Sequence, residues 1–119
     1  MNVVVLGASP DPSRYAYLAA KRLVAAGHQA IGVNPKLPQI PSLPVVRRVA
    51  ELPPGQHTLT VYVSAQVSHA IADEVIDYGF KRVVFNPGSE NPALMRRLAD
   101  AGVEVVPACT LVMLSTGEF

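Results

Sequence analysis

The sequence predicts an α/β fold: a single doubly wound parallel sheet of about five strands, with helices on both of its faces. A repeated unit is the first observation. Gly27, Gly79 and Gly102 each end an amphipathic segment and are followed within a few residues by a valine-rich strand. The strands are also short, continuous and β-branched rather than alternating, which is typical of parallel strands covered on both faces. Since right-handed crossovers join such alternating elements, we expect one compact domain, residues 1–119.

The expected strands cover residues 2–6, 29–33, 58–63, 82–85 and 103–106. Between the second and third of these strands lies a segment, residues 35–55, that holds most of the prolines of the chain. So many prolines argue against a full helix, although VVRRVAEL within it predicts a short turn or strand. We therefore expect this segment to wrap one edge of the sheet.

Each expected helix has an apolar face. The first two faces consist of Tyr15, Leu18, Ala19 and Leu23, and of Val67, Ile71, Val75 and Tyr78. The third helix begins with Asn91 and Pro92, an N-cap residue followed by proline at the first helical position. Its inward residues are expected to be Leu94, Leu98 and Ala101.

Composition excludes several classes of protein. Half of the residues are hydrophobic and 16% are charged, as in a well-packed globular protein. A net charge of +1 gives no general attraction to nucleic acid or to an anionic membrane. The one cysteine cannot form an internal disulfide, no basic leader precedes the first strand, and no apolar run approaches the roughly 20 residues that cross a bilayer. We expect a cytoplasmic protein that binds neither nucleic acid nor membrane.

Small and polar residues follow four of the expected strands. They are Gly7, Ala8 and Ser9 after the first strand, Asn34, Pro35 and Lys36 after the second, Ser64 after the third, and Asn86, Pro87 and Gly88 after the fourth. Open parallel sheets bind ligands outside the carboxyl ends of their strands. Gly7 and Ala8 allow a close backbone approach, and amides entering the first helix favour a phosphate. Because Ser9 adds a hydroxyl and Arg14 a charged fork, the sequence predicts a diphosphate site here.

The glycine pattern leaves alternatives open. Gly7 could serve only a tight turn, since the glycine pattern is incomplete and Ser9 stands where a dinucleotide fingerprint has its second glycine. At the end of the second strand, an NAD enzyme normally has an acidic residue for the ribose hydroxyls, whereas this chain has Lys36. A lysine suits a phosphate on the adenosine ribose, at the 3′ position in CoA or the 2′ position in NADP. The alternative is that Lys36 is a solvated loop lysine.

Five stretches together resemble the small CoA-binding protein family: GASPDPSRY, GHQAIGVNPK, LPVVRRVAELP, VYVSAQVSHAIADEVIDYGFKRVVFNPGSEN and AGVEVVPACTLV. The resemblance covers nearly the whole chain, with the stretches in order and at similar spacing. The resemblance implies a Rossmann-like domain similar to the N-terminal CoA-binding domain of the succinyl-CoA synthetase α subunit. It implies a set of CoA contacts: Gly7, Ala8, Ser9 and Arg14 at the diphosphate, Asn34, Pro35 and Lys36 near the ribose phosphate, Val63 and Ser64 at the adenine, and Asn86, Pro87 and Gly88 near the pantetheine.

Catalytic residues are scarce. His28, His57 and His69 lie on different elements and lack metal-ligand spacing, so we expect no metal site. Cys109 is interpreted as a packed thiol, with disulfide exchange with a bound CoA thiol as the alternative. The basic pairs Arg47-Arg48, Lys81-Arg82 and Arg96-Arg97 are interpreted as solvated.

The sequence thus predicts a stand-alone binding protein for CoA or acyl-CoA without catalytic residues, acting with a protein partner or as a homo-oligomer. Two alternatives stay open. One is a small NADP-dependent reductase, and the other is a regulatory nucleotide-binding or scaffold domain whose nucleotide site has decayed.

Overall fold

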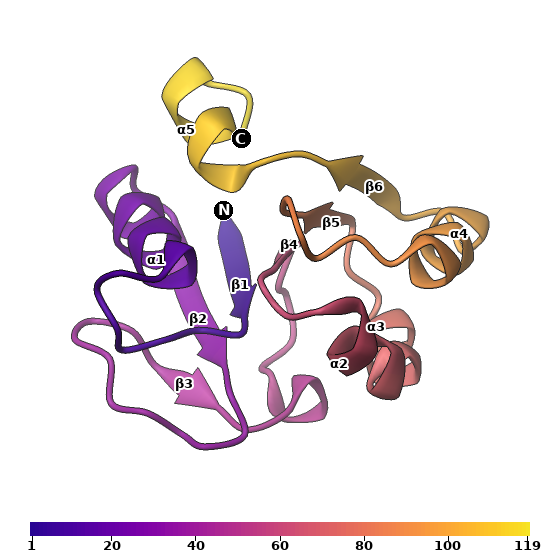
Figure 1. Ribbon diagram of the computed structural model, residues 1–119, viewed down its shortest axis with the longest axis horizontal. Coiled ribbons are helices and arrows are strands. Elements are labelled where there is room, and N and C mark those ends of the chain that lie inside the picture. Colours follow the sequence, from indigo (N-terminus) through magenta and orange to yellow (C-terminus); the bar gives the residue numbers. More distant parts are fainter.

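The computed structural model describes residues 1–119. Its strands form one six-stranded sheet in the order β3-β2-β1-β4-β5-β6 (Figure 1). The strands are β1 (Asn2–Leu6), β2 (Gln29–Val33), β3 (Val45–Val46), β4 (Thr58–Val61), β5 (Arg82–Phe85) and β6 (Glu104–Pro107). All neighbouring strands pair in parallel. The strand order reverses between β1 and β4, which makes the carboxyl ends of these two strands the switch point of a doubly wound sheet.

The α/β class and the doubly wound sheet are confirmed, and the five expected strands are all present. The sixth strand is β3, two residues long, which pairs with β2 at one edge. It lies in the proline-rich segment, where VVRRVAEL predicts a short turn or strand. The third expected strand ends at Val61 rather than at residue 63, and the last is shifted by one residue.

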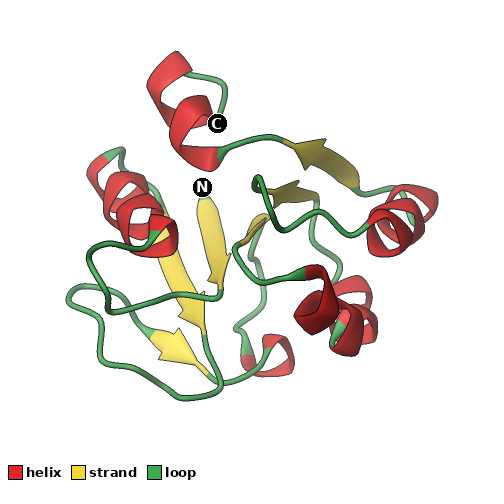
Figure 2. Ribbon diagram, in the orientation of Figure 1, coloured by secondary structure: helices red, strands yellow, loops and turns green.

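The helices form two layers, one on each face of the sheet (Figure 2). They are α1 (Tyr15–Ala25), α2 (Ala65–Ala70), α3 (Ala72–Tyr78), α4 (Pro92–Asp100) and α5 (Thr110–Thr116), with a 3₁₀ helix η1 (Val49–Glu51). Central strand β1 contributes to both layers, since Val3 and Val5 pack on the side of α1, while Val4 and Leu6 pack on the side of α3 and α4. This double burial explains why the strand is continuously apolar. No helix has the length and apolarity that crossing a membrane requires.

The expected apolar face of α1 is partly wrong. Tyr15 is 71% exposed and Leu18 is 38% exposed. The buried face consists instead of Ala16, Ala19, Ala20 and Leu23. This set also has helical spacing, so the pattern alone does not choose between the two faces. The small alanines let α1 lie close to the sheet.

Two further expectations on helices need correction. The second expected helix is divided at Ile71, whose φ of −115° and ψ of 16° end α2 and begin α3. Val67, expected on its apolar face, is 47% exposed. Leu94 and Leu98 are buried as expected, but Ala101 is exposed because α4 ends before it. The helix α5 was not expected from the sequence.

Candidate ligand-binding site

A hollow of about 570 Å³ lies at the carboxyl ends of β1, β2, β4 and β5. Eleven of the twelve residues proposed from the sequence line it: Gly7, Ala8, Ser9, Arg14, Asn34, Lys36, Val63, Ser64, Asn86, Pro87 and Gly88. The twelfth, Pro35, lines a neighbouring hollow of about 240 Å³. Gly7, Asn34 and Val63 belong to the walls of both hollows, which are therefore adjacent. The fold thus brings the sequence candidates together at its switch point.

Gly7 turns the chain sharply at the end of β1. Its amide donates to the carbonyl of Val33 at 3.0 Å, and its φ is +90°. A Cβ atom at this position would stand 2.9 Å from Cγ1 of Val63, closer than real Cβ contacts. Glycine is therefore required both for the backbone conformation and for the approach of the two strand ends.

The loop between β1 and α1 is held by its own side chains. The Ser9 hydroxyl accepts from the Asp11 amide at 3.1 Å, and Oδ1 of Asp11 accepts from the amide and the hydroxyl of Ser13 at 2.9 and 2.8 Å. The two bonds from Ser13 lower the pKa of Asp11 below its ordinary value. Oδ2 of Asp11 lies 3.9 Å from Nε of Arg14. These bonds order the loop without using the amides of Ala8 and Ser9.

Four backbone amides in this crossover have no partner within the chain. They belong to Ala8, Ser9, Tyr15 and Ala16, all of which line the hollow. No side chain caps the first turn of α1, whose N-cap residue is Arg14. Free amides at a helix start, with the positive end of the helix dipole, attract an anion. The exposed guanidinium of Arg14 adds a charge to the same place.

Asn34 joins the second crossover to the first. Its Nδ2 donates to the carbonyl of Ala8 at 2.8 Å, and its Oδ1 accepts from the amide of Lys36 at 2.9 Å. The Asn34 amide in turn donates to Val46 at 2.9 Å. The side chain of Asn34 is therefore a structural clamp at the hollow, and Lys36 is the exposed cation beyond it.

The side chain of Asn86 is committed to the protein interior. Its Nδ2 donates to Oγ1 of Thr60 at 2.7 Å and to the carbonyl of Val61 at 2.8 Å, while its Oδ1 accepts from the Thr110 amide at 2.8 Å. Only 3% of Asn86 is exposed. At this strand end Pro87 and Gly88 are exposed, and the Gly88 amide donates to Oε1 of Glu90 at 2.8 Å, which leaves the carbonyls of Pro87 and Gly88 for a ligand.

Tyr62 follows β4 and belongs to the wall of the larger hollow. Its hydroxyl is buried without a hydrogen-bond partner, which is unusual for a polar atom. Burial raises the pKa of Tyr62 to about 12, against the opposite effect of the nearby Thr110 and Thr60 hydroxyls. The phenol is therefore neutral at physiological pH and is not a general base there.

Several wall residues were missed by the sequence interpretation. Tyr15, Ala16, Tyr62 and Ser89 line the larger hollow, and Arg47 and Arg48 line the smaller one. The expectation that the two arginines are merely solvated is therefore incomplete. The sequence could have indicated Arg47, because a strand at residues 45–46 places this residue at the carboxyl end of a further strand, beside the other strand ends. The sequence did not decide between turn and strand there.

None of the histidines lines either hollow. His28 lies beside the N-terminus, with Nδ1 3.1 Å from the Met1 nitrogen, and its ring packs edge-on against Phe119. His57 contacts the Thr58 hydroxyl at 2.8 Å. No group of three or more His, Cys, Asp or Glu side chains could hold a metal ion. Asp73, on α3, pairs with Arg97 at 2.9 Å on the surface.

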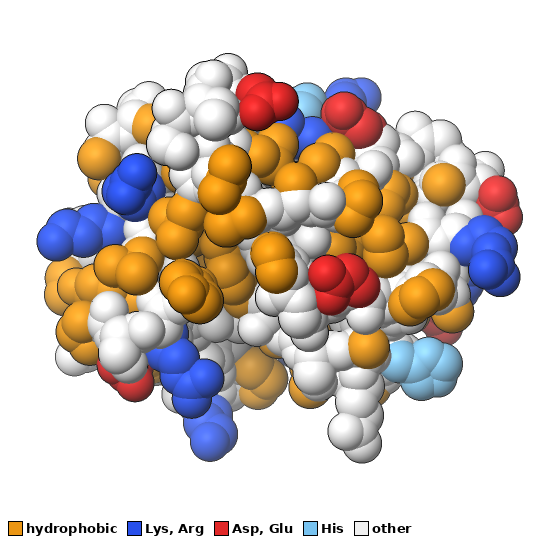
Figure 3. Space-filling view, turned by 45° about the horizontal axis from the view of Figure 1, so that its top comes forward, with side chains coloured by type: hydrophobic (Ala, Val, Ile, Leu, Met, Phe, Trp, Pro, Cys, Tyr) orange, Lys and Arg blue, Asp and Glu red, His pale blue; other side chains and the backbone are white.

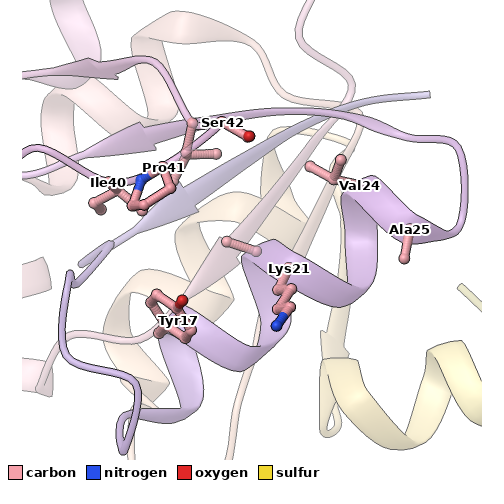
Figure 4. A pocket seen from close by; sticks show the side chains of 9 residues that line it. Tyr17, Lys21, Val24, Ala25, Ile40, Pro41 and Ser42 are labelled. Atoms are coloured by element: carbon pink, nitrogen blue, oxygen red, sulfur yellow. The ribbon is translucent and has the colours of Figure 1, made fainter.

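A third hollow, of about 380 Å³, lies between α1 and the loop of residues 40–43 (Figure 4). Its walls are mostly hydrophobic, with Lys21 and Tyr17 on the side of the helix. None of the residues at the carboxyl ends of the strands lines this third hollow. On the face shown in Figure 3, Lys and Arg side chains stand in separate groups near the margins rather than in one patch.

A doubly wound parallel sheet with unpaired amides at its switch point defines a Rossmann-like binding domain. The model of the CoA binding domain family matches residues 1–115, and the chain belongs to this family. The identification agrees with the resemblance carried by the sequence motifs.

Solved structures share the fold. An uncharacterized protein matches with a TM-score of 0.93 and 39% identity, over 99% of this chain and 97% of that one. A conserved hypothetical protein from Pyrococcus furiosus matches with a TM-score of 0.80 and 33% identity, over 88% of this chain and 90% of that one. The dinucleotide-forming acetyl-coenzyme A synthetase 1 of Ca. Korarchaeum cryptofilum shows the same fold, with a TM-score of 0.76 and 21% identity over 90% of this chain and 25% of that one. No curated protein matches the chain.

Proposed function

We propose that this chain is a stand-alone binding protein for CoA or acyl-CoA, with no turnover of its own. One observation carries the proposal: the unpaired amides of Ala8, Ser9, Tyr15 and Ala16 gather with Arg14 at the switch point of the sheet. Such an arrangement suits a diphosphate. Membership of the CoA binding domain family supports CoA as the ligand that contains this diphosphate.

The two adjacent hollows suit the parts of an extended ligand. The diphosphate would lie against the amides of the first crossover, with the ribose phosphate near Lys36. The adenine would enter the smaller hollow, whose wall includes Val49, Val63, Val67 and Ile71. Such apolar walls favour a flat base. The pantetheine arm would pass Pro87 and Gly88 toward solvent.

The walls supply binding groups and few reactive ones. The ionisable side chains around the larger hollow are Arg14, Lys36, Tyr15 and Tyr62. None is a carboxylate or histidine that could serve as a general base at neutral pH, and the pKa of Tyr62 is raised to about 12. These features support binding without catalysis. A protein of this kind would deliver or sense the cofactor in the cytoplasm, with a partner protein or a second copy of itself.

Isothermal titration with CoA, 3′-dephospho-CoA and NADPH tests the proposal. We expect CoA to bind more tightly than the other two, and CoA recovered after incubation to be chemically unchanged. Tighter binding of NADPH, with a change in nicotinamide absorbance, would instead support a small reductase. Absence of heat and of thermal shift with all three ligands would favour a regulatory domain whose site no longer binds nucleotides.

A further inference from the structure

We propose that Arg47 recognises the ribose phosphate of the ligand together with Lys36, and so makes the site selective for adenosine ligands that carry this phosphate. The inference rests on the proposed function and extends it to a residue at the sheet edge. It follows from strand register, from the walls of the smaller hollow and from the different partners of two neighbouring arginines.

Register places Arg47 next to the second crossover. The last paired residues of β2 and β3 are Val33 and Val46, and the Asn34 amide donates to the Val46 carbonyl at 2.9 Å. Arg47 therefore follows directly on the strand end beside Asn34. Because Lys36 is two residues beyond Asn34, the two cations stand at adjacent strand ends.

The smaller hollow connects Arg47 with the candidate ligand site. Arg47 and Arg48 line it, together with Gly7 and Asn34, which also line the larger hollow. Apart from these arginines, the only charged side chain in its wall is that of Glu74. An adenosine held there would have its ribose close to the second crossover, where both hollows share Asn34.

The two arginines differ in their partners. Arg48 Nη2 lies 3.4 Å from Oε2 of Glu74, whose Oε1 also accepts from the Ala50 amide at 3.2 Å. Arg48 thus ties the segment around η1 to α3. No carboxylate lies within ion-pair distance of the Arg47 guanidinium. Its backbone is nevertheless fixed, because Oε1 of Glu51 accepts from the Arg47 amide at 3.0 Å.

A free guanidinium on a fixed backbone is suited to a terminal phosphate. Its planar fork can donate two parallel hydrogen bonds to a phosphate monoester, which an ammonium group cannot do. A diphosphate in the chain of the ligand is already met by the amides of the first crossover. Arg47 should therefore respond to the terminal ribose phosphate and have little effect on the remainder of the ligand.

The test compares Arg47→Met with wild type by titration of CoA and 3′-dephospho-CoA. We expect the substitution to weaken CoA binding about tenfold and to change binding of the dephospho form by less than about twofold. Arg96→Met is the matched control, because it removes one positive charge from α4 at a residue that lines neither hollow and has no ion pair. It should leave both affinities unchanged. Arg48→Met should weaken the two ligands equally, since it loosens the wall.

Equal weakening of both ligands by Arg47→Met would overturn the inference while leaving CoA binding in place. Titration of NADPH and NADH separates the two sources of a ribose phosphate. If wild type binds NADPH and not CoA, and Arg47→Met removes the preference for NADPH over NADH, the role of Arg47 stands and the proposed function falls. If wild type binds none of the four, both fall.

Discussion

The side chain of Asn34 reaches across from the second crossover and donates to the Ala8 carbonyl at 2.8 Å. The same side chain accepts from the Lys36 amide. One amide group thus fixes the spacing between the loop that would hold a diphosphate and the lysine that would meet a ribose phosphate. This bond engages the Ala8 carbonyl, whereas the amides of Ala8 and Ser9 have no partner within the chain.

Asn34→Ala should therefore weaken CoA binding more than it weakens the fold. Loss of two hydrogen bonds should lower the free energy of unfolding by about 1–2 kcal/mol. We expect about a tenfold loss of CoA affinity, because the crossovers lose their common anchor. Urea unfolding and titration calorimetry measure the two effects. A loss of stability without any loss of affinity would show that the clamp has no role in the site.

Gly7→Ala should be strongly destabilising. The left-handed conformation costs an alanine about 1–2 kcal/mol, and the contact with Val63 adds about 1–3 kcal/mol. Gly27→Ala is the matched control, because Gly27 has the same φ of +90° but nothing lies within 4 Å of the place where its added methyl group would stand. Urea denaturation should show the larger loss for Gly7→Ala. Equal losses of unfolding free energy would mean that the contact between the added methyl group and Val63 does not destabilise the fold.

Asn86→Ala should reveal a structural role. It leaves the Thr60 hydroxyl, the Val61 carbonyl and the Thr110 amide without a shared partner, at a cost of about 2–4 kcal/mol. Thermal unfolding should show a clearly lower Tm, whereas Pro87→Ala next to it should change Tm little. An Asn86→Ala variant as stable as wild type would contradict the assignment of this side chain to the interior.

The alkaline stability of the protein should depend on Tyr62. Its pKa is about 12 in the folded state and about 10 when unfolded, so the unfolded state loses its proton first as the pH rises. Stability present below pH 10 should therefore decline between about pH 10 and 12. Tyr62→Phe should flatten this decline and be neutral or stabilising at pH 7, because it removes an unpaired buried hydroxyl. Urea midpoints at pH 9 and 11 for both proteins measure the effect, and parallel declines would contradict it.

Most of the fold could be predicted because strand and helix signals repeat. Gly27, Gly79 and Gly102 all have the positive φ expected of residues that end helices. The face of α1 could not be predicted, because two sets of residues have helical spacing and only the approach to the sheet selects the alanines. Strand β3 was undecided because its two residues gain their order from pairing with β2, a tertiary effect.

Those residues of the candidate site that directly follow a strand could be predicted from the sequence. Gly7, Asn34 and Gly88 could be placed at one edge because parallel strands end together. The hydrogen-bond partners of the side chains could not be inferred from the sequence. Asn86 was expected to face the ligand, but its polar atoms are all used within the protein. The place of Arg47 at the site could not be inferred without recognising the strand that precedes it.

The most direct test of the account is a titration of ¹⁵N-labelled protein with CoA, followed by amide chemical shifts. If the diphosphate binds at the first crossover, the amide protons of Ala8, Ser9, Tyr15 and Ala16 shift most and move downfield, since each gains a phosphate acceptor. If CoA leaves these four amides unmoved, or shifts amides around α4 instead, the diphosphate does not bind at the first crossover.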